Sequence, residues 1–263
     1  LLLTVATTVN AQSVTWISST EGNVWQKSKV KLQSKSEQNP VLQVDGTENG
    51  VVFKNWGTTF NELCWDALGV LTRTEQDEIL YNIFSPQGDL RITRGRISMG
   101  ANDYARSWYS CDEVEGDFEL RYFNINRDKQ TIIPFIRAAQ KYNPNLTFWI
   151  SPWCPPSWMK INGDYPVLSS PFNSLSEKQN YLLYGATGGQ VDENEMKLTD
   201  ARDGVFPRQL ATTDFMIQDP RYLQTYADYF CRFIDAYKEQ GIPIDMVMYQ
   251  NEAYSYTPYP GCA

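Results

Sequence analysis

An acidic side chain follows a short apolar run in the C-terminal part of the chain. Ile244–Tyr249 is followed directly by Gln250, Asn251 and Glu252. A carboxylic acid in such a place can stay protonated near neutrality if apolar walls or other carboxylates raise its pKa, and it can then protonate a leaving oxygen. The amide of Asn251 could hydrogen-bond a hydroxyl group of the same ligand. An acid at a strand end that only solvates a loop is the alternative.

The absence of histidine narrows the chemistry that the chain can perform. Ser-His-Asp and Cys-His nucleophiles and His-ligated zinc sites are excluded, so acid–base work falls to carboxylates, Tyr, Lys or Cys. The five cysteines match no zinc-binding spacing, and we expect most of them to be buried thiols, with one disulfide left open. They are Cys64, Cys111, Cys154, Cys231 and Cys262. No metal or cofactor is expected.

Charge and composition limit the possible partners. The formal net charge is −8 and Lys and Arg form no cluster, which argues against nucleic acid and anionic membranes as partners. Aromatic residues make up 14% of the chain, which suits a cleft that stacks on sugar rings and equally a large aromatic core. Beyond the first residues, no run approaches the ~20 apolar residues of a membrane span.

Strands and helices alternate from residue 51 onward. The predicted strands are Val51–Phe60, Leu90–Ile97, Leu146–Ile150 and Ile244–Tyr249. The predicted helices are one that begins at the capping box Thr72–Glu75, one over about Lys129–Tyr142 and one from the N-cap Asp219 to Gly241. The apolar face of the last helix is expected to consist of Leu223, Ala227, Phe230, Phe233, Ile234 and Tyr237. This alternation predicts a parallel sheet, either a barrel or a doubly wound sheet.

Residues that could bind a ligand gather directly after the predicted strands. They are Asn61, Glu62, Asp103, Tyr104, Trp153, Trp158, Asn251 and Glu252. No G-x-G-x-x-G or Walker A sequence follows the first strand, which argues against a nucleotide site. In a TIM barrel the loops after the strands form the catalytic face. We therefore predict an α/β fold of the TIM (β/α)8 type, of which this chain supplies about four βα units.

The N-terminal part is predicted to lie outside the barrel. Residues 1–11 resemble the end of a signal peptide with a cleavage site at Val9-Asn10-Ala11, and a buried strand is the alternative. Residues 12–50 contain short alternating apolar runs separated by turn signals, which favours β-hairpins. Residues 51–263 would form the barrel half, with a long polar insertion at about 161–218. We expect the protein to be secreted, periplasmic or at the cell surface.

Five sequence blocks stand in a fixed order along the chain. They are WGTTFNE at 56–62, RISMGANDY at 96–104, SPWCPPSWMK at 151–160, the helical segment Tyr226–Gly241, and QNE at 250–252. Together they resemble glycoside hydrolase family 30, the glucosylceramidase-like branch of the retaining barrel glycosidases, over about residues 55–255. The resemblance implies a retaining β-glycosidase on a TIM barrel, with a side β-sandwich to which residues 14–50 would belong.

The resemblance also implies roles for five residues. Glu252 would be the general acid and then the general base, and Asn251 would bind the sugar hydroxyl next to the reacting carbon. Asp103 and Trp153 would hold the reacting ring in the −1 subsite. Arg96 would support the site from the second strand, and a buried structural ion pair is the equally open alternative for Arg96.

Other positions within the blocks have structural alternatives. Trp158 fits wall packing better than ligand contact, and Asn61 and Glu62 could simply cap a loop or the following helix. Two departures from the family leave the shape of the subsites open. They are Thr58-Thr59 where the family often has a further Gly, and Ala253 where Pro is usual.

A retaining mechanism needs a second carboxylate that acts as the nucleophile, roughly 5 Å from the acid. The resemblance places it at the end of a seventh strand, so these 263 residues alone are expected to be inactive. The expected substrate is a β-glucoside, either β-1,6-glucan or a glucosylceramide-like glucoside. A xylan- or fucoside-directed enzyme and a non-catalytic carbohydrate-binding protein are the alternatives.

Overall fold

The computed structural model describes residues 13–31, 50, 52–167, 170–175, 215–253 and 258–262. The signal peptide predicted for residues 1–11 lies outside these residues, as does much of the insertion predicted at about 161–218. The chain divides into two compact units, Leu1–Val52 and Phe53–Ala263.

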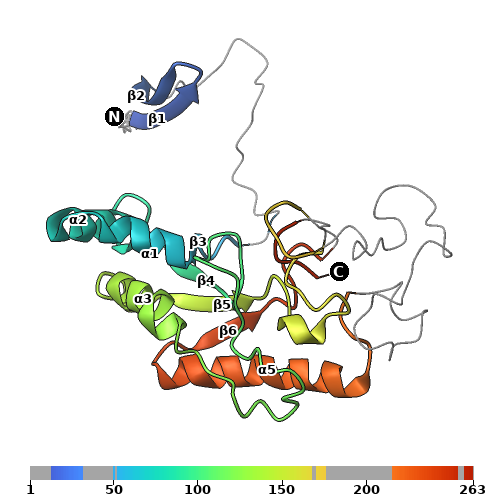
Figure 1. Ribbon diagram of the computed structural model, residues 1–263. Coiled ribbons are helices and arrows are strands. Elements are labelled where there is room, and N and C mark those ends of the chain that lie inside the picture. Colours follow the sequence, from blue (N-terminus) through green and yellow to red (C-terminus); the bar gives the residue numbers. More distant parts are fainter. Residues whose placement is uncertain are drawn as a thin grey trace, which may run out of the picture. The chain divides into compact units, whose positions relative to one another are not determined.

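The described part of the first unit contains a β-hairpin (Figure 1). Strand β1 (Ser13–Thr20) pairs with β2 (Asn23–Lys31) in antiparallel register, and the pairing shifts between Ser18 and Thr20. Gly22 takes the turn with φ +79°, a conformation that glycine adopts without steric cost. The hairpin prediction is therefore met for this segment, while residues 32–49 lie outside the described part. Membership of a side β-sandwich stays a prediction.

The second unit is built on a parallel sheet of four strands in the order β3-β4-β5-β6 (Figure 1). The strands are β3 (Gly57–Phe60), β4 (Arg94–Ser98), β5 (Thr147–Ser151) and β6 (Ile244–Val247). Each strand lies next to its predecessor in the chain, with no reversal of order. Such an order is that of a (β/α) barrel, whereas a doubly wound sheet reverses its strand order at a switch point.

Two predicted strands begin later than expected. The stretch before β4 folds back on the last turn of the preceding helix, because Leu90 N–H donates to the carbonyl of Asn82 and Ile92 N–H to that of Ile83, each at 2.9 Å. Arg94 is the first residue of β4, and it pairs with Gly57 of β3. The residues before Gly57 therefore have no register partner in β4. The sheet thus starts at Gly57 and not at residue 51.

Three of the described α-helices, α1 (Glu62–Gly69), α2 (Arg73–Phe84) and α5 (Pro220–Glu239), begin at a capping side chain that accepts a hydrogen bond from a backbone N–H group of the first turn. The other described helices are α3 (Ile132–Gln140) and the short 3-10 helices η1 (Asp128–Gln130) and η2 (Ser157–Met159). The predicted capping box between Thr72 and Glu75 is present, and Asp219 caps α5 as expected. Helix α1 was not expected as an element, and Asn61 caps it by accepting a hydrogen bond from the N–H of Cys64 at 2.9 Å.

The face that α5 buries agrees in part with the apolar face predicted for it. The buried residues are Thr225, Tyr229, Phe233 and Tyr237, while Leu223 is exposed. The prediction is confirmed for Phe233 and Tyr237, and it misses Thr225 and Tyr229, whose hydroxyl groups find partners inside. Tyr229 accepts from the N–H of Cys111 at 2.9 Å, and Tyr237 donates to Asp128 at 2.6 Å. A count of apolar side chains does not register such pairs.

The core lies between the helices and one face of the sheet. Phe60, Ile97, Phe148 and Ile150 of the strands pack with side chains of α2, α3 and α5 such as Phe84, Phe135, Ile136 and Phe233. In Figure 1, α3 lies between α2 and α5. Because side chains alternate along a strand, Arg94, Arg96 and Trp149 lie on the opposite face.

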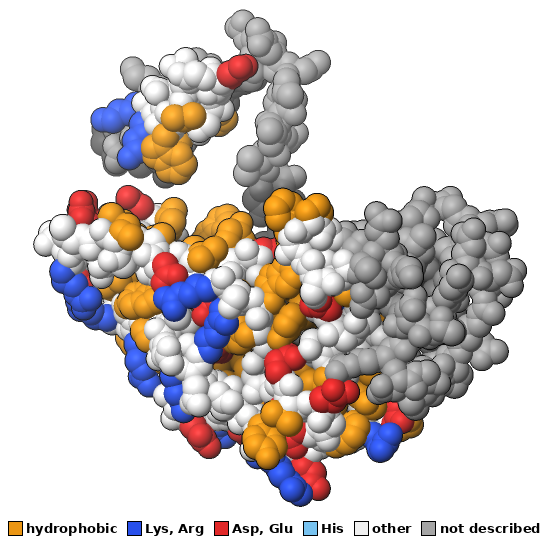
Figure 2. Space-filling model, in the orientation of Figure 1, with side chains coloured by type: hydrophobic (Ala, Val, Ile, Leu, Met, Phe, Trp, Pro, Cys, Tyr) orange, Lys and Arg blue, Asp and Glu red, His pale blue; other side chains and the backbone are white. Residues whose placement is uncertain are grey.

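Charged side chains of both signs are mixed on one face of the molecule (Figure 2), and most of the cysteines are buried. On the face shown in Figure 2, acidic and basic side chains are interspersed over the described part of the molecule. Three of the five cysteines are buried and two are exposed. The buried ones are Cys111, Cys154 and Cys262, and the exposed ones are Cys64 and Cys231.

Candidate active site

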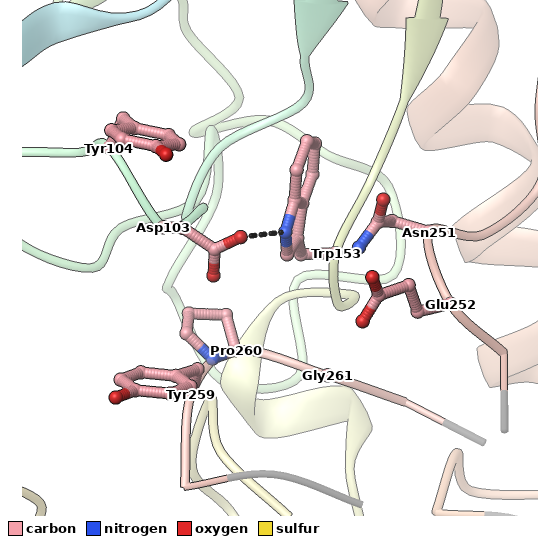
Figure 3. Close-up of a pocket in the computed structure, with 8 residues that line it drawn as sticks. All are labelled: Asp103, Tyr104, Trp153, Asn251, Glu252, Tyr259, Pro260 and Gly261. Carbon is pink, nitrogen blue, oxygen red and sulfur yellow. Dashed lines mark hydrogen bonds between the residues drawn. The ribbon is translucent and has the colours of Figure 1, made fainter. Parts of the chain in front are cut away.

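A pocket of about 390 Å³ opens in the loops that follow β4, β5 and β6. Its lining consists of Asp103, Tyr104, Trp153, Asn251, Glu252, Tyr259, Pro260 and Gly261, all drawn in Figure 3. The structure therefore brings together Asp103, Trp153, Asn251 and Glu252, which are four of the five residues that the sequence singled out. The volume falls within the ~300–1,000 Å³ range of small-ligand pockets.

Arg96, the fifth of these residues, lies behind the lining. Its Nη2 donates to Oδ1 of Asn251 at 2.6 Å, and its Nε donates to the hydroxyl of Ser151 at 2.9 Å. The guanidinium carbon lies 4.2 Å from the ring centroid of Trp153. Burial lowers the pKa of Arg96, and the charges of Asp103 and Glu252 act in the opposite direction. Arg96 thus contacts two site residues directly, and its hydrogen bonds go to neutral side chains.

The contact with Arg96 fixes the orientation of Asn251. Since the amide oxygen accepts from Arg96, the amide NH2 group turns to the pocket, as Figure 3 shows. The segment after β6 is also tied to the loop after β5, because Asn251 N–H donates to the carbonyl of Pro152 at 2.8 Å and Gln250 Nε2 to that of Trp153 at 2.5 Å. Asn251 therefore presents a hydrogen-bond donor to a ligand.

Asp103 and Trp153 form a hydrogen-bonded pair across the pocket wall. The indole Nε1 of Trp153 donates to Oδ2 of Asp103 at 3.1 Å. Trp153 is 7% exposed, whereas Asp103 is exposed and directs its second oxygen into the pocket (Figure 3). The pair offers an aromatic surface next to an acceptor for hydroxyl groups.

Glu252 lines the same pocket from the other side of Trp153, and its carboxylate faces inward (Figure 3). Its backbone has φ +46°, in the left-handed region that non-glycine residues seldom adopt. Residues held in such conformations cluster at functional sites, because the surrounding structure must enforce them. The side chain is exposed, so the carboxylate is accessible to a ligand in the pocket.

A buried ion pair anchors the loop that carries Asp103. Glu62 is 0% exposed and accepts from Nε and Nη2 of Arg127 at 2.8 and 2.6 Å, and from the N–H of Arg106 at 2.8 Å. Burial by itself would raise the pKa of Glu62, but the hydrogen bonds and charges of Arg127 and Arg106 outweigh it and hold the pKa below its ordinary value. The carbonyl of Tyr104 also accepts from the N–H of Leu63 at 3.1 Å. Glu62 therefore fixes the loop, and Asn61 caps α1.

Trp158 takes the packing role that the sequence favoured for it. It is 2% exposed, its Nε1 donates to the carbonyl of Asp112 at 3.0 Å, and its ring contacts Phe118 and Tyr222. It is absent from the described lining of the pocket.

The segment after Glu252 supplies pocket residues that the sequence did not single out. Tyr259, Pro260 and Gly261 line the pocket, and the N–H of Gly261 donates to the carbonyl of Tyr165 at 3.1 Å. The signal available in the sequence was the turn-forming run 258–261, which follows the same strand as the predicted acid.

The described residues lack two further features. They contain no group of three or more Cys, Asp or Glu side chains arranged to hold a metal ion. None of the helices among them combines the length and apolar character needed to cross a membrane.

Comparison with known proteins identifies relatives of the chain. It is 27% identical over 250 residues to the Caenorhabditis elegans protein named "Putative glucosylceramidase 4", covering 94% of this chain and 40% of that protein. It is 26% identical over 231 residues to the Aspergillus fumigatus endo-1,6-beta-D-glucanase neg1, covering 86% and 40% respectively. It is 26% identical over 194 residues to the Mus musculus lysosomal acid glucosylceramidase, covering 72% and 29%.

Solved structures show the same fold. The endo-beta1,6-glucanase BT3312 matches with a TM-score of 0.58 at 21% identity, covering 85% of this chain and 40% of that one. SrfJ from Salmonella typhimurium matches with a TM-score of 0.60 at 16% identity, covering 90% and 43%.

These matches cover only part of the relatives' length. The chain spans about two fifths of the length of the first relatives and structures that it matches, and less of others. A family model described as the glycosyl hydrolase family 30 TIM-barrel domain matches residues 53–170, which include β3, β4 and β5 and the loops of Asp103 and Trp153. Residues 53–170 of this chain are therefore similar to the TIM-barrel domain of glycosyl hydrolase family 30.

Proposed function

We propose that this chain carries the acid/base carboxylate of a retaining β-glycosidase and that Glu252 is that carboxylate. The observation that supports the proposal is the convergence of Asp103, Trp153, Asn251 and Glu252 on one pocket after parallel strands. TIM-barrel enzymes build their active sites at this end of the barrel. The family that residues 53–170 resemble is a family of glycosyl hydrolases.

In this proposal Glu252 acts first as an acid and then as a base. Its protonated carboxyl group donates a proton to the glycosidic oxygen while the bond to the anomeric carbon breaks. The resulting carboxylate then removes a proton from the water molecule that releases the sugar from the enzyme. The inward-facing, accessible side chain is compatible with both steps.

The other pocket residues bind the sugar ring. The NH2 group of Asn251 donates to the hydroxyl next to the reacting carbon, a contact that strengthens as charge develops on the ring. Asp103 accepts from hydroxyl groups at the far end of the ring, and Trp153 packs against its C–H groups. Arg96 contacts the protein and acts on the sugar only through Asn251 and Trp153.

The nucleophile is expected from another part of the enzyme. Retaining enzymes place it about 5–5.5 Å from the acid. Asp103, the second carboxylate in the described lining, is tied to Trp153 and lies beyond Trp153 from Glu252 in Figure 3, which fits a ring-binding role. A carboxylate facing Glu252 from a further strand of the barrel would complete the site.

The relatives point to glucose as the sugar. Their names describe glucosylceramidases and endo-1,6-beta-D-glucanases, which both cleave a bond to a β-linked glucosyl unit. We therefore propose a β-glucoside as the substrate.

The test is the variant Glu252→Gln in the intact protein. We expect hydrolysis of β-1,6-glucan to fall by about 10²–10⁴-fold, because proton transfer to the leaving oxygen is lost. Turnover of p-nitrophenyl β-glucoside should recover when azide is added, because azide attacks the glycosyl-enzyme without a general base. Sugar release and formation of glucosyl azide are the quantities to measure.

The matched control is Glu78→Gln, at an exposed position on α2 away from the pocket. It should hydrolyse glucan as the wild type does. Full activity of Glu252→Gln would exclude the acid/base role. An inactive wild type that still binds glucan through Asp103 would favour a non-catalytic carbohydrate-binding protein.

A further inference from the structure

We infer that Tyr104 and Tyr259 form a subsite for a second sugar, attached at the non-reducing side of the glucosyl unit that Glu252 would release. The inference rests on the proposed function, and it specifies the substrate as a glucan that continues beyond the reacting ring. It concerns residues to which the comparison with the family assigned no role.

The two tyrosines differ from the rest of the lining in their exposure. Tyr104 is 57% exposed and Tyr259 is 58% exposed, whereas the aromatic wall Trp153 is 7% exposed. Both tyrosines line the pocket. They thus present ring surface and hydroxyl groups at the rim, where a ligand that extends out of the pocket would pass.

Their position relative to the acid decides which part of a substrate they meet. In Figure 3 both tyrosines lie on the Asp103 side of the pocket, and Glu252 and Asn251 lie on the other side of Trp153. The glycosidic oxygen must come within about 2.6–3.2 Å of the carboxyl group that protonates it. The anomeric carbon and the leaving group therefore occupy the Glu252 end, and the ring points its remaining hydroxyl groups towards Asp103.

A substituent on those remaining hydroxyl groups would contact the tyrosines. In a β-1,6-linked chain the next sugar on the non-reducing side is attached through O6, on the exocyclic carbon C6, and not at the anomeric carbon. Such a sugar would leave the pocket past Asp103 and reach Tyr104 and Tyr259. Glucosylceramide has no substituent there, because its lipid is attached at the anomeric carbon.

The backbone at both tyrosines is held by its neighbours. Tyr104 N–H donates to Oδ1 of Asn102 at 2.9 Å, and its carbonyl accepts from Leu63 as described above. Tyr259 lies between two prolines, of which Pro260 pairs with Pro166 and Pro258 accepts from Nδ2 of Asn173 at 3.2 Å. A fixed backbone leaves only the side-chain torsions of the two tyrosines to be ordered when a ligand binds.

The chemistry of the rim suits a sugar better than a lipid chain. A tyrosine ring offers an apolar face for pyranose C–H groups and a hydroxyl group for hydrogen bonding. The exposed carboxylate of Asp103 lies beside both rings in Figure 3, and an acyl chain placed there would have to desolvate it.

The experiment compares two chromogenic substrates in the intact protein. Release of p-nitrophenol from p-nitrophenyl β-gentiobioside requires the inner glucose at the reacting position and the outer glucose in the inferred subsite. Release from p-nitrophenyl β-glucoside leaves that subsite empty. The ratio of the two kcat/KM values therefore measures the subsite, and we expect a ratio of about ten in the wild type.

Variants test whether the two tyrosines are the cause of this ratio of kcat/KM values. Tyr104→Ala and Tyr259→Ala should each lower it about three- to fivefold, and the double variant should bring it close to one. Tyr104→Phe and Tyr259→Phe keep the rings and should retain most of it. The control Tyr122→Ala, at an exposed tyrosine outside this pocket, should leave the ratio unchanged.

Two outcomes overturn the inference. A wild-type ratio near one, or a ratio that stays the same in both alanine variants, excludes the subsite. The proposed function still stands in that case if p-nitrophenyl β-glucoside is hydrolysed. If neither substrate is cleaved and Glu252→Gln changes nothing, the proposed function fails and the subsite falls with it.

Discussion

Asn251 presents its NH2 group to the pocket because Arg96 occupies its oxygen. The guanidinium group donates in a fixed planar geometry to Asn251 and Ser151 and stacks over the ring of Trp153. Lysine would supply the positive charge without these planar, fixed N–H donors. At the scale of single residues, the site thus depends on a side chain that does not line it.

The variant Arg96→Lys tests this dependence. We expect kcat/KM for p-nitrophenyl β-glucoside to fall by up to about 100-fold, because an error of about 1 Å in the position of a binding group can have that effect. The control is Arg94→Lys on the same strand, where Arg94 pairs with Asp245 at 2.6 Å and away from the pocket. Steady-state kinetics of both variants check the prediction. Equal losses would show that Arg96 has no special part in positioning Asn251.

At the scale of elements, the loop between β4 and η1 is held by its neighbour α1. The first residue of α1, Glu62, binds Arg127 at one end of this loop and the backbone of Arg106 near Asp103. One buried carboxylate therefore fixes a loop of about thirty residues at two points. This arrangement explains how an exposed aspartate can keep a defined place in the pocket.

The variant Glu62→Gln should loosen this loop and destabilise the fold. Removing one partner of a buried ion pair costs about 3 kcal/mol, the low end of the usual range because Arg127 keeps access to solvent. Urea denaturation of the intact protein measures the change in the free energy of unfolding. The control Asp66→Asn breaks the exposed pair with Arg106 and should cost much less. A neutral effect of Glu62→Gln would contradict the anchoring role.

At the scale of the whole molecule, Asp128 joins three segments in the core. Its two oxygens accept from the hydroxyls of Tyr109 in the loop after β4, at 2.7 Å, and Tyr237 of α5, at 2.6 Å. Burial raises the pKa of Asp128 to about 6, against the opposing effect of the two hydrogen bonds. The folded state therefore holds a proton here that the unfolded chain releases above its ordinary pKa of 3.8.

Stability should depend on pH through this group. Because its pKa is raised in the folded state, its contribution is fully present below about pH 4 and is lost as the pH rises through about 6. The difference between 3.8 and about 6 corresponds to about 3 kcal/mol. Asp128→Asn should therefore gain stability relative to the wild type by up to this amount between pH 4 and pH 7. Urea denaturation at a series of pH values measures the difference.

A variant with the opposite sign serves as the control. Hydrogen bonds from Tyr142 and Lys141 lower the pKa of Asp77, so its contribution is present above the ordinary pKa and is lost as the pH falls. Asp77→Asn should be less stable than the wild type at neutral pH, and this difference in the free energy of unfolding should shrink as the pH falls below the ordinary pKa of 3.8. Parallel pH profiles of Asp128→Asn and the wild type would contradict a raised pKa at Asp128.

The sequence by itself determined the alternation of strands and helices, the caps at Thr72 and Asp219, and the acid that follows β6. These features are local, because periodic burial and capping involve residues within a few positions of each other. The order of the strands followed from the same alternation, since parallel strands joined by helices pack in sequence. The types of residue at the strand ends also indicated where a ligand would bind.

Only the tertiary structure decided how distant side chains meet. Arg96 and Asn251 are 155 residues apart and Asp128 and Tyr237 are 109 apart, so no periodicity records these hydrogen bonds. The same holds for the place of Tyr259 at the pocket rim and for the burial of Tyr229 in α5. A polar group can be buried only if its partner is present in space, and that partner becomes known when the chain is folded.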